Sequence, residues 1–282
     1  MKPPFTYFGG KSSVAPQIVA LLPPHEHYVE PFAGSLAVLM AKAPSRMETV
    51  NDLDGNVMTF WRMLRDRPAD LERACALTPH SRAENIGSYD LDVDDDLERA
   101  RRVWIRFTQG RGGQLKRTGW RFYQDSRGSH SSMPDYLDAY VSRLAPAAVR
   151  LRGVSLECKP ALELIGDYGR HPDTLIYADP PYPAEVRSLT HGRCRGPDYQ
   201  HELRTDSKHR ELLEALLGCR SAVVLSGYAT ALYGDLLCTW FRQEIRAQTG
   251  NGGDDRERTE VLWSNRPFPA PQATLFDLEA AE

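Results

Sequence analysis

The chain has 282 residues, 41% of them hydrophobic, and a formal net charge of −3 at pH 7. This is the composition of a globular protein with an ample core, and no apolar run approaches the roughly 18 residues of a membrane-spanning helix. The N-terminus carries no hydrophobic leader, so we expect an intracellular, cytoplasmic protein. The five cysteines are widely spaced without a C-x-x-C pair and the eight histidines show no ligand spacing, so we expect neither a disulfide framework nor a catalytic metal.

Strand-like runs and helical patterns alternate along most of the chain. The helical patterns include residues 14–22, 36–43 and 209–217, and the strand-like runs are residues 28–30, 48–51, 154–158, 174–178, 221–226, 241–247 and 260–263. This alternation predicts an α/β fold built on a mostly parallel sheet. The last two runs are joined by a glycine-rich stretch without space for a crossover helix, so they predict an antiparallel hairpin at the sheet edge.

A long insertion separates the second strand-like run from the third. It opens with helical stretches at 60–64 and 70–76 and then becomes basic, glycine-rich and aromatic. We therefore expect a sheet domain made of residues 1–58 and 152–266, an inserted module at 59–151 and a loosely ordered tail at 267–282.

The insertion contains a strong local charge. Between Arg99 and Arg152, twelve Lys or Arg residues stand against three Asp, with aromatic residues and glycines among them. Such a segment in a protein of near-zero net charge predicts a face that binds a polyanion, and a solvated charged surface is the alternative. The candidate polyanion contacts are Arg106, Arg111, Lys116, Arg117, Arg121 and Arg127.

The tetrapeptide Asp179-Pro180-Pro181-Tyr182 follows the apolar run 174–178, which is typical of a buried parallel strand. Proline fixes φ and has no N–H, so the backbone carbonyls of this tetrapeptide can face outward as hydrogen-bond acceptors. A carboxylate, outward carbonyls and an aromatic face suit a planar ring that carries an exocyclic amine. A proline-rich turn after a core strand is the alternative.

Two glycine-bearing loops precede helices in the first part of the chain. The loop at 30–34 reads E-P-F-A-G, and its glycine lets a ligand approach the backbone, although Glu30 can also be a structural strand-end acid. The loop at 8–11 reads F-G-G-K without the spacing of a P-loop, which argues against binding of a nucleoside triphosphate. Its Lys11 either binds a carboxylate or is solvated. Asp52 ends the second strand, where an acid can hold a ribose or cap the next helix.

Four motifs occur in one order, with the large insertion between the third and the fourth. They are F-G-G-K at 8–11, E-P-F-A-G at 30–34, N-D-L-D at 51–54 and D-P-P-Y at 179–182. Together with L-S-G-Y at 225–228 they make the chain resemble the Dam-like (D12 class, alpha group) DNA adenine-N6 methyltransferases over about residues 5–265. Tyr228 is expected to line the same crevice as Asp179 or else to be a packed aromatic. No Pro-Cys dipeptide is present, so the setting usual for methylation of a base carbon is missing.

The resemblance implies a Rossmann-like, S-adenosylmethionine-dependent methyltransferase sheet, with the insertion as the DNA target-recognition domain. The implied catalytic residues are Asp179, Pro180, Pro181 and Tyr182. The implied donor-binding residues are Tyr7, Phe8, Gly9, Gly10, Lys11, Glu30, Pro31, Phe32, Ala33, Gly34, Asp52, Leu53 and Asp179. Pro160 stands where the family often has an acid for the adenine amine of the donor, so another group, near 156–159, is expected to take that role.

The implied reaction is methyl transfer to the N6 amine of adenine in double-stranded DNA. Asp179 and the Pro180 carbonyl would accept hydrogen bonds from the amine of a flipped base, on which Tyr182 would stack. Transfer to the N4 amine of cytosine is the nearest alternative. Methylation of RNA or of a protein amide, and a non-catalytic DNA-binding role, are further alternatives. The recognition sequence, a partner restriction endonuclease, and the choice between monomer and weak dimer stay open.

Overall fold

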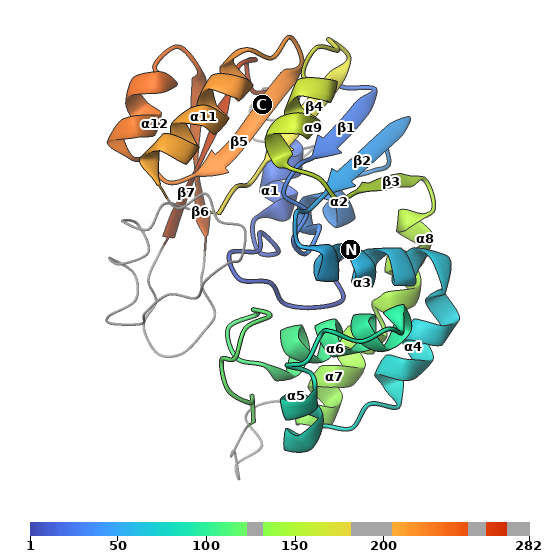
Figure 1. Ribbon diagram of the computed structural model, residues 1–282. Helices are drawn as coiled ribbons and strands as arrows, with labels where there is room; N and C mark the ends of the chain where they lie inside the picture. Colours follow the sequence, from blue (N-terminus) through green and yellow to red (C-terminus); the bar gives the residue numbers. More distant parts are fainter. Residues whose placement is uncertain (123–131, 182–204, 248–257, 270–282) are drawn as a thin grey trace, which may run out of the picture.

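The computed structural model describes residues 1–122, 132–181, 205–247 and 258–269. Its centre is one seven-stranded sheet with the strand order β3-β2-β1-β4-β5-β7-β6 (Figure 1). The strands are β1 (His27–Glu30), β2 (Met47–Asn51), β3 (Val154–Glu157), β4 (Thr174–Ala178), β5 (Ala222–Gly227), β6 (Phe241–Ala247) and β7 (Arg258–Ser264). Each strand-like run of the sequence therefore corresponds to a strand.

The pairing directions agree with the predicted fold class. The first five strands pair in parallel, and β7 pairs antiparallel with both β5 and β6. The mostly parallel α/β sheet and its antiparallel C-terminal hairpin are thus confirmed. Within the hairpin β7 joins the sheet and β6 forms the edge. Strand β4 is buried along its whole length, which is why its sequence is a continuous apolar run instead of an alternating one.

Helices cover both faces of the sheet (Figure 1). Successive strand residues point to opposite faces, so two cores form. One core holds Val29 and Ile176 with α9, α11 and α12, and the other holds Tyr28 and Leu175 with α1 and α2. These helices are α1 (Ala15–Ala20), α2 (Ala37–Ala41), α9 (Ala161–Tyr168), α11 (Asp206–Leu217) and α12 (Ala231–Leu236).

The insertion is largely helical in its described part and lies below the sheet in Figure 1. Its helices are α3 (Gly55–Asp66), α4 (Pro68–Ala76), α5 (Arg82–Gly87), α6 (Asp96–Gln109), α7 (Met133–Val141) and α8 (Leu144–Leu151). Asp54, Asp95 and Ser132 cap α3, α6 and α7 by accepting hydrogen bonds from first-turn N–H groups. Because α3 begins at Gly55, the expected start of the insertion at residue 59 lies inside a helix.

The N-terminal segment is fixed against the insertion. The buried ring of Phe5 stacks on Phe107 of α6, with 4.6 Å between ring centroids. Nε1 of Trp104, also in α6, donates a hydrogen bond to the Pro4 carbonyl at 3.1 Å. Since the glycine loop at 8–11 follows directly, the insertion helps to hold that loop in place.

A buried charge cluster joins the last helix of the insertion to the sheet. Glu48 of β2 accepts hydrogen bonds from Lys42 Nζ and from Arg150 Nη2, each at 2.7 Å. Burial alone would raise the pKa of Glu48, but the hydrogen bonds from Arg150 and Lys42 outweigh it and hold that pKa below its ordinary value. The cluster therefore contains an ionised carboxylate with both of these cations against it.

No helix in the described ranges combines the length and the apolar character that a bilayer crossing requires. Residues 270–282 of the tail that we expect to be loosely ordered lie outside the described residues.

Candidate active site

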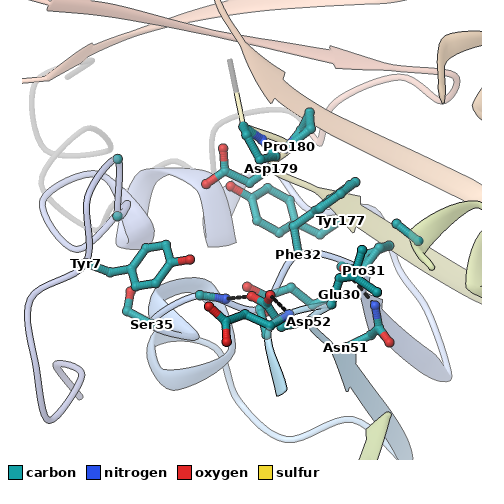
Figure 2. A pocket seen from close by; sticks show the side chains of 18 of the residues that line it. Tyr7, Glu30, Pro31, Phe32, Ser35, Asn51, Asp52, Tyr177, Asp179 and Pro180 are labelled. Atoms are coloured by element: carbon teal, nitrogen blue, oxygen red, sulfur yellow. Dashed lines mark hydrogen bonds between the residues drawn. The ribbon is translucent and has the colours of Figure 1, made fainter. Parts of the chain in front are cut away.

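A cavity of about 350 Å³ opens at the carboxyl ends of β1, β2 and β4 (Figure 2). All the residues expected to hold a donor line it, in the loops 7–11, 30–34 and 52–53 and at Asp179, and Pro180 and Pro181 join them. The carboxyl edge of a parallel sheet is where loops after different strands converge, so residues far apart in sequence meet there. Tyr182 lies outside the described residues.

The turn after β1 requires its glycine. Gly34 has a φ of +45°, and a Cβ at this position would lie 2.9 Å from the ring of Tyr7. Its N–H donates to Asp52 Oδ2 at 2.9 Å, and its carbonyl accepts from Trp61 Nε1 at 3.0 Å. The end of β2 and helix α3 therefore both fix the backbone of the turn that lines the cavity.

Asp52 braces this turn and the loop that follows β2. One of its oxygens accepts from Gly34, and the other accepts from the Asp54 N–H at 3.0 Å. The cap of α3 is Asp54, whose Oδ1 accepts from the Asn56 N–H at 2.9 Å. The alternative in which Asp52 caps that helix is therefore wrong. A carboxylate oxygen can accept more than one hydrogen bond, so bracing the turn is compatible with binding a ligand hydroxyl.

Asn51 is absent from the expected site residues, yet it fixes the floor of the cavity. It is fully buried, and its amide donates to the carbonyls of Pro31 and Lys159 at 3.0 Å and accepts from the Lys159 N–H at 2.9 Å. It thus ties the ends of β1 and β2 to the start of α9. Residues 160–162 at that start line the cavity, and Pro160 gives it an apolar wall.

Lys11 is a buried cation beside Asp179. Its Nζ lies 2.7 Å from Asp179 Oδ1 and 3.6 Å from Glu260 Oε1, and the residue is 5% exposed. Burial by itself lowers the pKa of Lys11, but the attraction of Asp179 and Glu260 outweighs it and raises that pKa above its ordinary value. The alternative of a solvated lysine is therefore wrong.

Glu30 is a buried acid on the cavity wall. Figure 2 shows its carboxyl group with those of Asp52 and Asp179 around the cavity. Burial raises the pKa of Glu30 to about 8. The hydrogen bond that Glu30 accepts from Tyr28 Oη at 3.0 Å lowers this pKa, and the nearby Asp179 raises it further. Glu30 is thus largely protonated at neutral pH and would ionise if a cation came close to it.

Arg106 does not lie on the DNA-facing surface that we expected for it. It is fully buried in α6, its guanidinium donates to the carbonyls of Leu115 (3.0 Å) and Lys116, and it lies 3.8 Å over the ring of Tyr89. The prediction that Arg106 contacts DNA is wrong, because its burial leaves no group at the surface. Its role is to hold the basic loop that follows α6.

The other basic candidates lie in or just after that loop. Arg111 and Arg117 are exposed and Lys116 and Arg121 are half-buried, whereas Arg127 lies outside the described residues. The loop also touches the cavity, because the Phe8 N–H donates to the Gly113 carbonyl at 2.8 Å. The part of the insertion that carries the basic residues therefore contacts the glycine loop directly.

An aromatic stack stands beside these arginines. His80 and Trp120 stack with 4.3 Å between ring centroids, and Trp120 and Phe122 with 5.6 Å. The guanidinium of Arg82 lies over Trp120 and that of Arg111 over Phe122, which is 37% exposed. Such a stack with flanking cations can bind planar rings and phosphates.

Several cavity residues lie outside the sequence motifs. Tyr177 precedes Asp179 by two positions, so the two-residue period of a strand could have indicated it. Lys208 and Leu212 come from α11, and no local pattern indicates where that helix packs. The further cavity residues outside the expected set are Ser35, Ala37, Val38, Asn51, Asp54, Pro160, Ala161 and Leu162. Tyr228 does not line the cavity, although it is near enough to Lys11 to help raise the pKa of the lysine.

Within the described ranges, no group of three or more His, Cys, Asp or Glu side chains is placed to hold a metal ion.

Two solved structures have a distant likeness to the chain. A precorrin 8w decarboxylase from Methanobacterium thermoautotrophicum has a TM-score of 0.38 at 10% identity, over 94% of this chain and 97% of that one. A candidate methyltransferase from Streptococcus mutans in complex with SAH has a TM-score of 0.33 at 7% identity, over 89% and 96%. Neither score is high enough to carry an argument about function.

No curated protein matches the chain. Its N-terminal third does match a protein family, and this third contains both glycine loops, Asp52 and the first helices of the insertion. Residues 7–102 match the family model for D12 class N6 adenine-specific DNA methyltransferase, which confirms the resemblance drawn from the motifs.

Proposed function

We propose that the chain is a DNA methyltransferase that transfers a methyl group from S-adenosylmethionine to the N6 amine of adenine. The observation that carries the proposal is the position of Asp179 at the carboxyl end of β4, on the wall of a cavity that also has Glu30 and Asp52 on it. The match of residues 7–102 to the D12 family model supports adenine as the target base.

The charges of the cavity fit a cationic donor. Among the described residues that line it, the acids Glu30, Asp52, Asp54 and Asp179 outnumber the lysines Lys11 and Lys208. S-adenosylmethionine supplies an electrophilic methyl group on a positively charged sulfonium. Glu30 is the buried acid that would hold a cation, and Asp52 directly follows β2, a position where ribose hydroxyls are commonly bound. Pro160 and its neighbours would pack on the base of the donor.

Lys11 is better suited to the reacting end of the cavity than to a donor carboxylate. Its ammonium already has Asp179 at 2.7 Å and Glu260 at 3.6 Å. A third anion would have to compete with both. We therefore assign Lys11 to the orientation of Asp179, and the glycine loop at 8–10 to contact with the donor.

Asp179 would act on the target amine. An exocyclic amine of a base is a poor nucleophile because its lone pair is delocalised into the ring. A hydrogen bond from the amine to the Asp179 carboxylate favours a pyramidal nitrogen with an available lone pair. As the new N–C bond forms, the S–CH3 bond of the sulfonium would break and leave a neutral thioether, and the nitrogen would lose a proton, which Asp179 can accept. Because Pro180 and Pro181 have no N–H, the backbone beside Asp179 offers acceptors only.

The exposed side chains of the insertion suit a DNA duplex. Arg111 and Arg117 can contact phosphates, and the stack of His80, Trp120 and Phe122 offers a flat face for a base or sugar. The hydrogen bond between the basic loop and Phe8 gives this surface a direct connection to the cavity. We therefore propose residues 59–151 as the target-recognition domain.

The proposal is tested by incubating the purified chain with tritiated S-adenosylmethionine and duplex DNA, with RNA and protein as competing acceptors. Label should enter the DNA. Asp179→Ala should slow transfer by about 1,000-fold and leave donor affinity largely unchanged. Asp167→Ala is the matched control, because Asp167 is an exposed acid paired with Lys159. Label in RNA or protein instead of DNA, or normal transfer by Asp179→Ala, would contradict the proposal.

A further inference from the structure

Glu260 of β7 is a second buried carboxylate next to Lys11. It is 7% exposed, and its Oε1 lies 3.6 Å from Lys11 Nζ. The hydroxyl of Ser226 on β5 donates to the same oxygen at 2.6 Å. Ser226 is paired with Leu262 in the sheet, and residues two apart share a face, so Glu260 lies diagonally beside Ser226. The sheet itself therefore fixes this carboxylate close to the reacting end of the cavity.

Glu260 stands apart from the groups that would touch the donor. Among the described residues that line the cavity, Asp179 is present and Glu260 is not. We therefore expect Glu260 to act on the reaction through a neighbour, and among the described residues Lys11 places a cation within 4 Å of it.

In the proposed reaction, Asp179 interacts with two different groups, Lys11 and the target amine. In the structure its Oδ1 accepts a hydrogen bond from Lys11 Nζ at 2.7 Å. During transfer the same carboxylate must accept from the target amine and then take its proton. An ammonium at this distance withdraws electron density from the carboxylate and weakens it as an acceptor and a base. The reaction is thus favoured if Lys11 can loosen its hold on Asp179.

We propose that Glu260 is a positioning residue that takes over the Lys11 ammonium when Asp179 turns to the target amine. This inference rests on the proposed function. A shift of Nζ by about 1 Å would convert the ion pair with Glu260 into a hydrogen bond of ordinary length and lengthen the one to Asp179. Lys11 keeps an anionic partner in both positions, so at no stage is a buried charge left uncompensated.

The neighbouring groups are compatible with this exchange. The hydrogen bond from Ser226 keeps Glu260 in place whether or not Lys11 is close to it. Tyr177 is buried in β4, and burial together with Asp179 and Glu260 raises its pKa well above the ordinary value, so it stays a neutral phenol. Among the described residues, Glu30 and Tyr233 also act on this cluster through Asp179, and Tyr228 acts on it through Lys11. The mobile charge of the cluster is therefore that of Lys11.

The test is Glu260→Gln, which keeps the side-chain length and an acceptor for Ser226 but removes the charge. We expect kcat for transfer to DNA to fall by about 10-fold, with the donor Kd unchanged. In a Lys11→Met background the same substitution should have no further effect on kcat, because Glu260 acts through Lys11. Glu260→Asp keeps the charge, so its kcat should lie between those of Glu260→Gln and the wild type. If Glu260→Gln fails to fold, Glu260→Asp is compared with the wild type instead.

Glu244→Gln is the matched control, because Glu244 is an exposed acid on the adjacent strand β6. Its kcat should equal that of the wild type. A wild-type kcat in Glu260→Gln would overturn this inference but not the proposed function. The same holds if Glu260→Gln lowers kcat equally in the Lys11→Met background, or if weaker donor binding explains the whole loss of activity. Absence of transfer by the wild type would instead overturn the proposed function, and this inference with it.

Discussion

Lys11 Nζ and Asp179 Oδ1 lie 2.7 Å apart, although 168 positions of the sequence separate the two residues. The contact joins the N-terminal glycine loop to the carboxyl end of β4. Because the pKa of Lys11 is raised, the lysine stays charged throughout the neutral range. Lys11 therefore holds Asp179 in one orientation before any substrate arrives, and the proposed reaction starts from that orientation.

Donor binding should depend on pH through Glu30. Its pKa is about 8 because of burial, so below that pH a cation must displace a proton in order to meet an ionised Glu30. Affinity should therefore rise with pH, by up to tenfold per unit, between about pH 6.5 and about pH 8, and level off above. Calorimetry in two buffers of different ionisation enthalpy should also detect proton release near pH 7.

The control for this prediction is Glu30→Gln, which cannot ionise. Its donor affinity should be weak and independent of pH across the same range. A wild-type Kd that does not change with pH would show that no cation binds near Glu30.

Gly113→Ala should disturb the cavity through the basic loop. Gly113 has a φ of +61°, and a Cβ there would lie 3.1 Å from Phe8 N. Gly112→Ala is a closely matched control, because Gly112 has a φ of +78° but open space around a Cβ. Both variants should be destabilised by about 1 kcal/mol through backbone strain. Only Gly113→Ala should also weaken donor binding, and equal donor affinities in the two variants would contradict this coupling.

DNA affinity should depend on the exposed arginines of the basic loop. Charge reversal of Arg111 and Arg117 together should weaken binding and reduce the slope of log Kd against log salt by about 2, since each phosphate contact contributes about 1. Fluorescence anisotropy over a series of salt concentrations measures both the DNA affinity and its salt dependence. Arg170→Glu, at an exposed arginine after α9, should leave affinity unchanged. Unchanged binding by the double variant at low salt would mean that DNA binds elsewhere.

The buried cluster around Glu48 should matter more for stability than a surface ion pair does. Glu48→Ala leaves Lys42 and Arg150 uncompensated and should lower the free energy of unfolding by about 3–5 kcal/mol. Asp70→Ala breaks the exposed pair with Arg67 and should cost less than about 1 kcal/mol. Because the folded-state pKa of Glu48 is depressed, its contribution is present above its unfolded pKa and is lost as pH falls through the folded value. Urea unfolding at neutral and acid pH checks both statements.

The sequence predicts the sheet well because its signals are local. The continuous apolar run of β4 and the short glycine-rich connection before β7 indicate a parallel core strand and an antiparallel hairpin without any tertiary information. The loops at 8–11 and 30–34 and Asp52 could be placed together because parallel strands bring their carboxyl ends to one edge.

The rest depends on packing that no local pattern reports. Arg106 looks like its exposed neighbours in sequence, yet it faces the interior of the insertion and holds the loop after α6. Asn51 contacts Lys159, which is more than 100 positions away in the sequence, and Glu260 contacts Lys11, which is more than 200 positions away. His80 follows α4 and Trp120 follows α6, and these two helices, which pack together, bring the two rings into contact. These relations are set by register and helix packing, so the sequence alone does not reveal them.

The most direct test of this account is the nucleoside composition of duplex DNA after incubation with the chain and S-adenosylmethionine, measured by mass spectrometry. N6-methyl-2′-deoxyadenosine should form with the wild type and be absent after the same incubation with Asp179→Ala. N4-methylcytosine in its place, or DNA without any methylated amine, would contradict it.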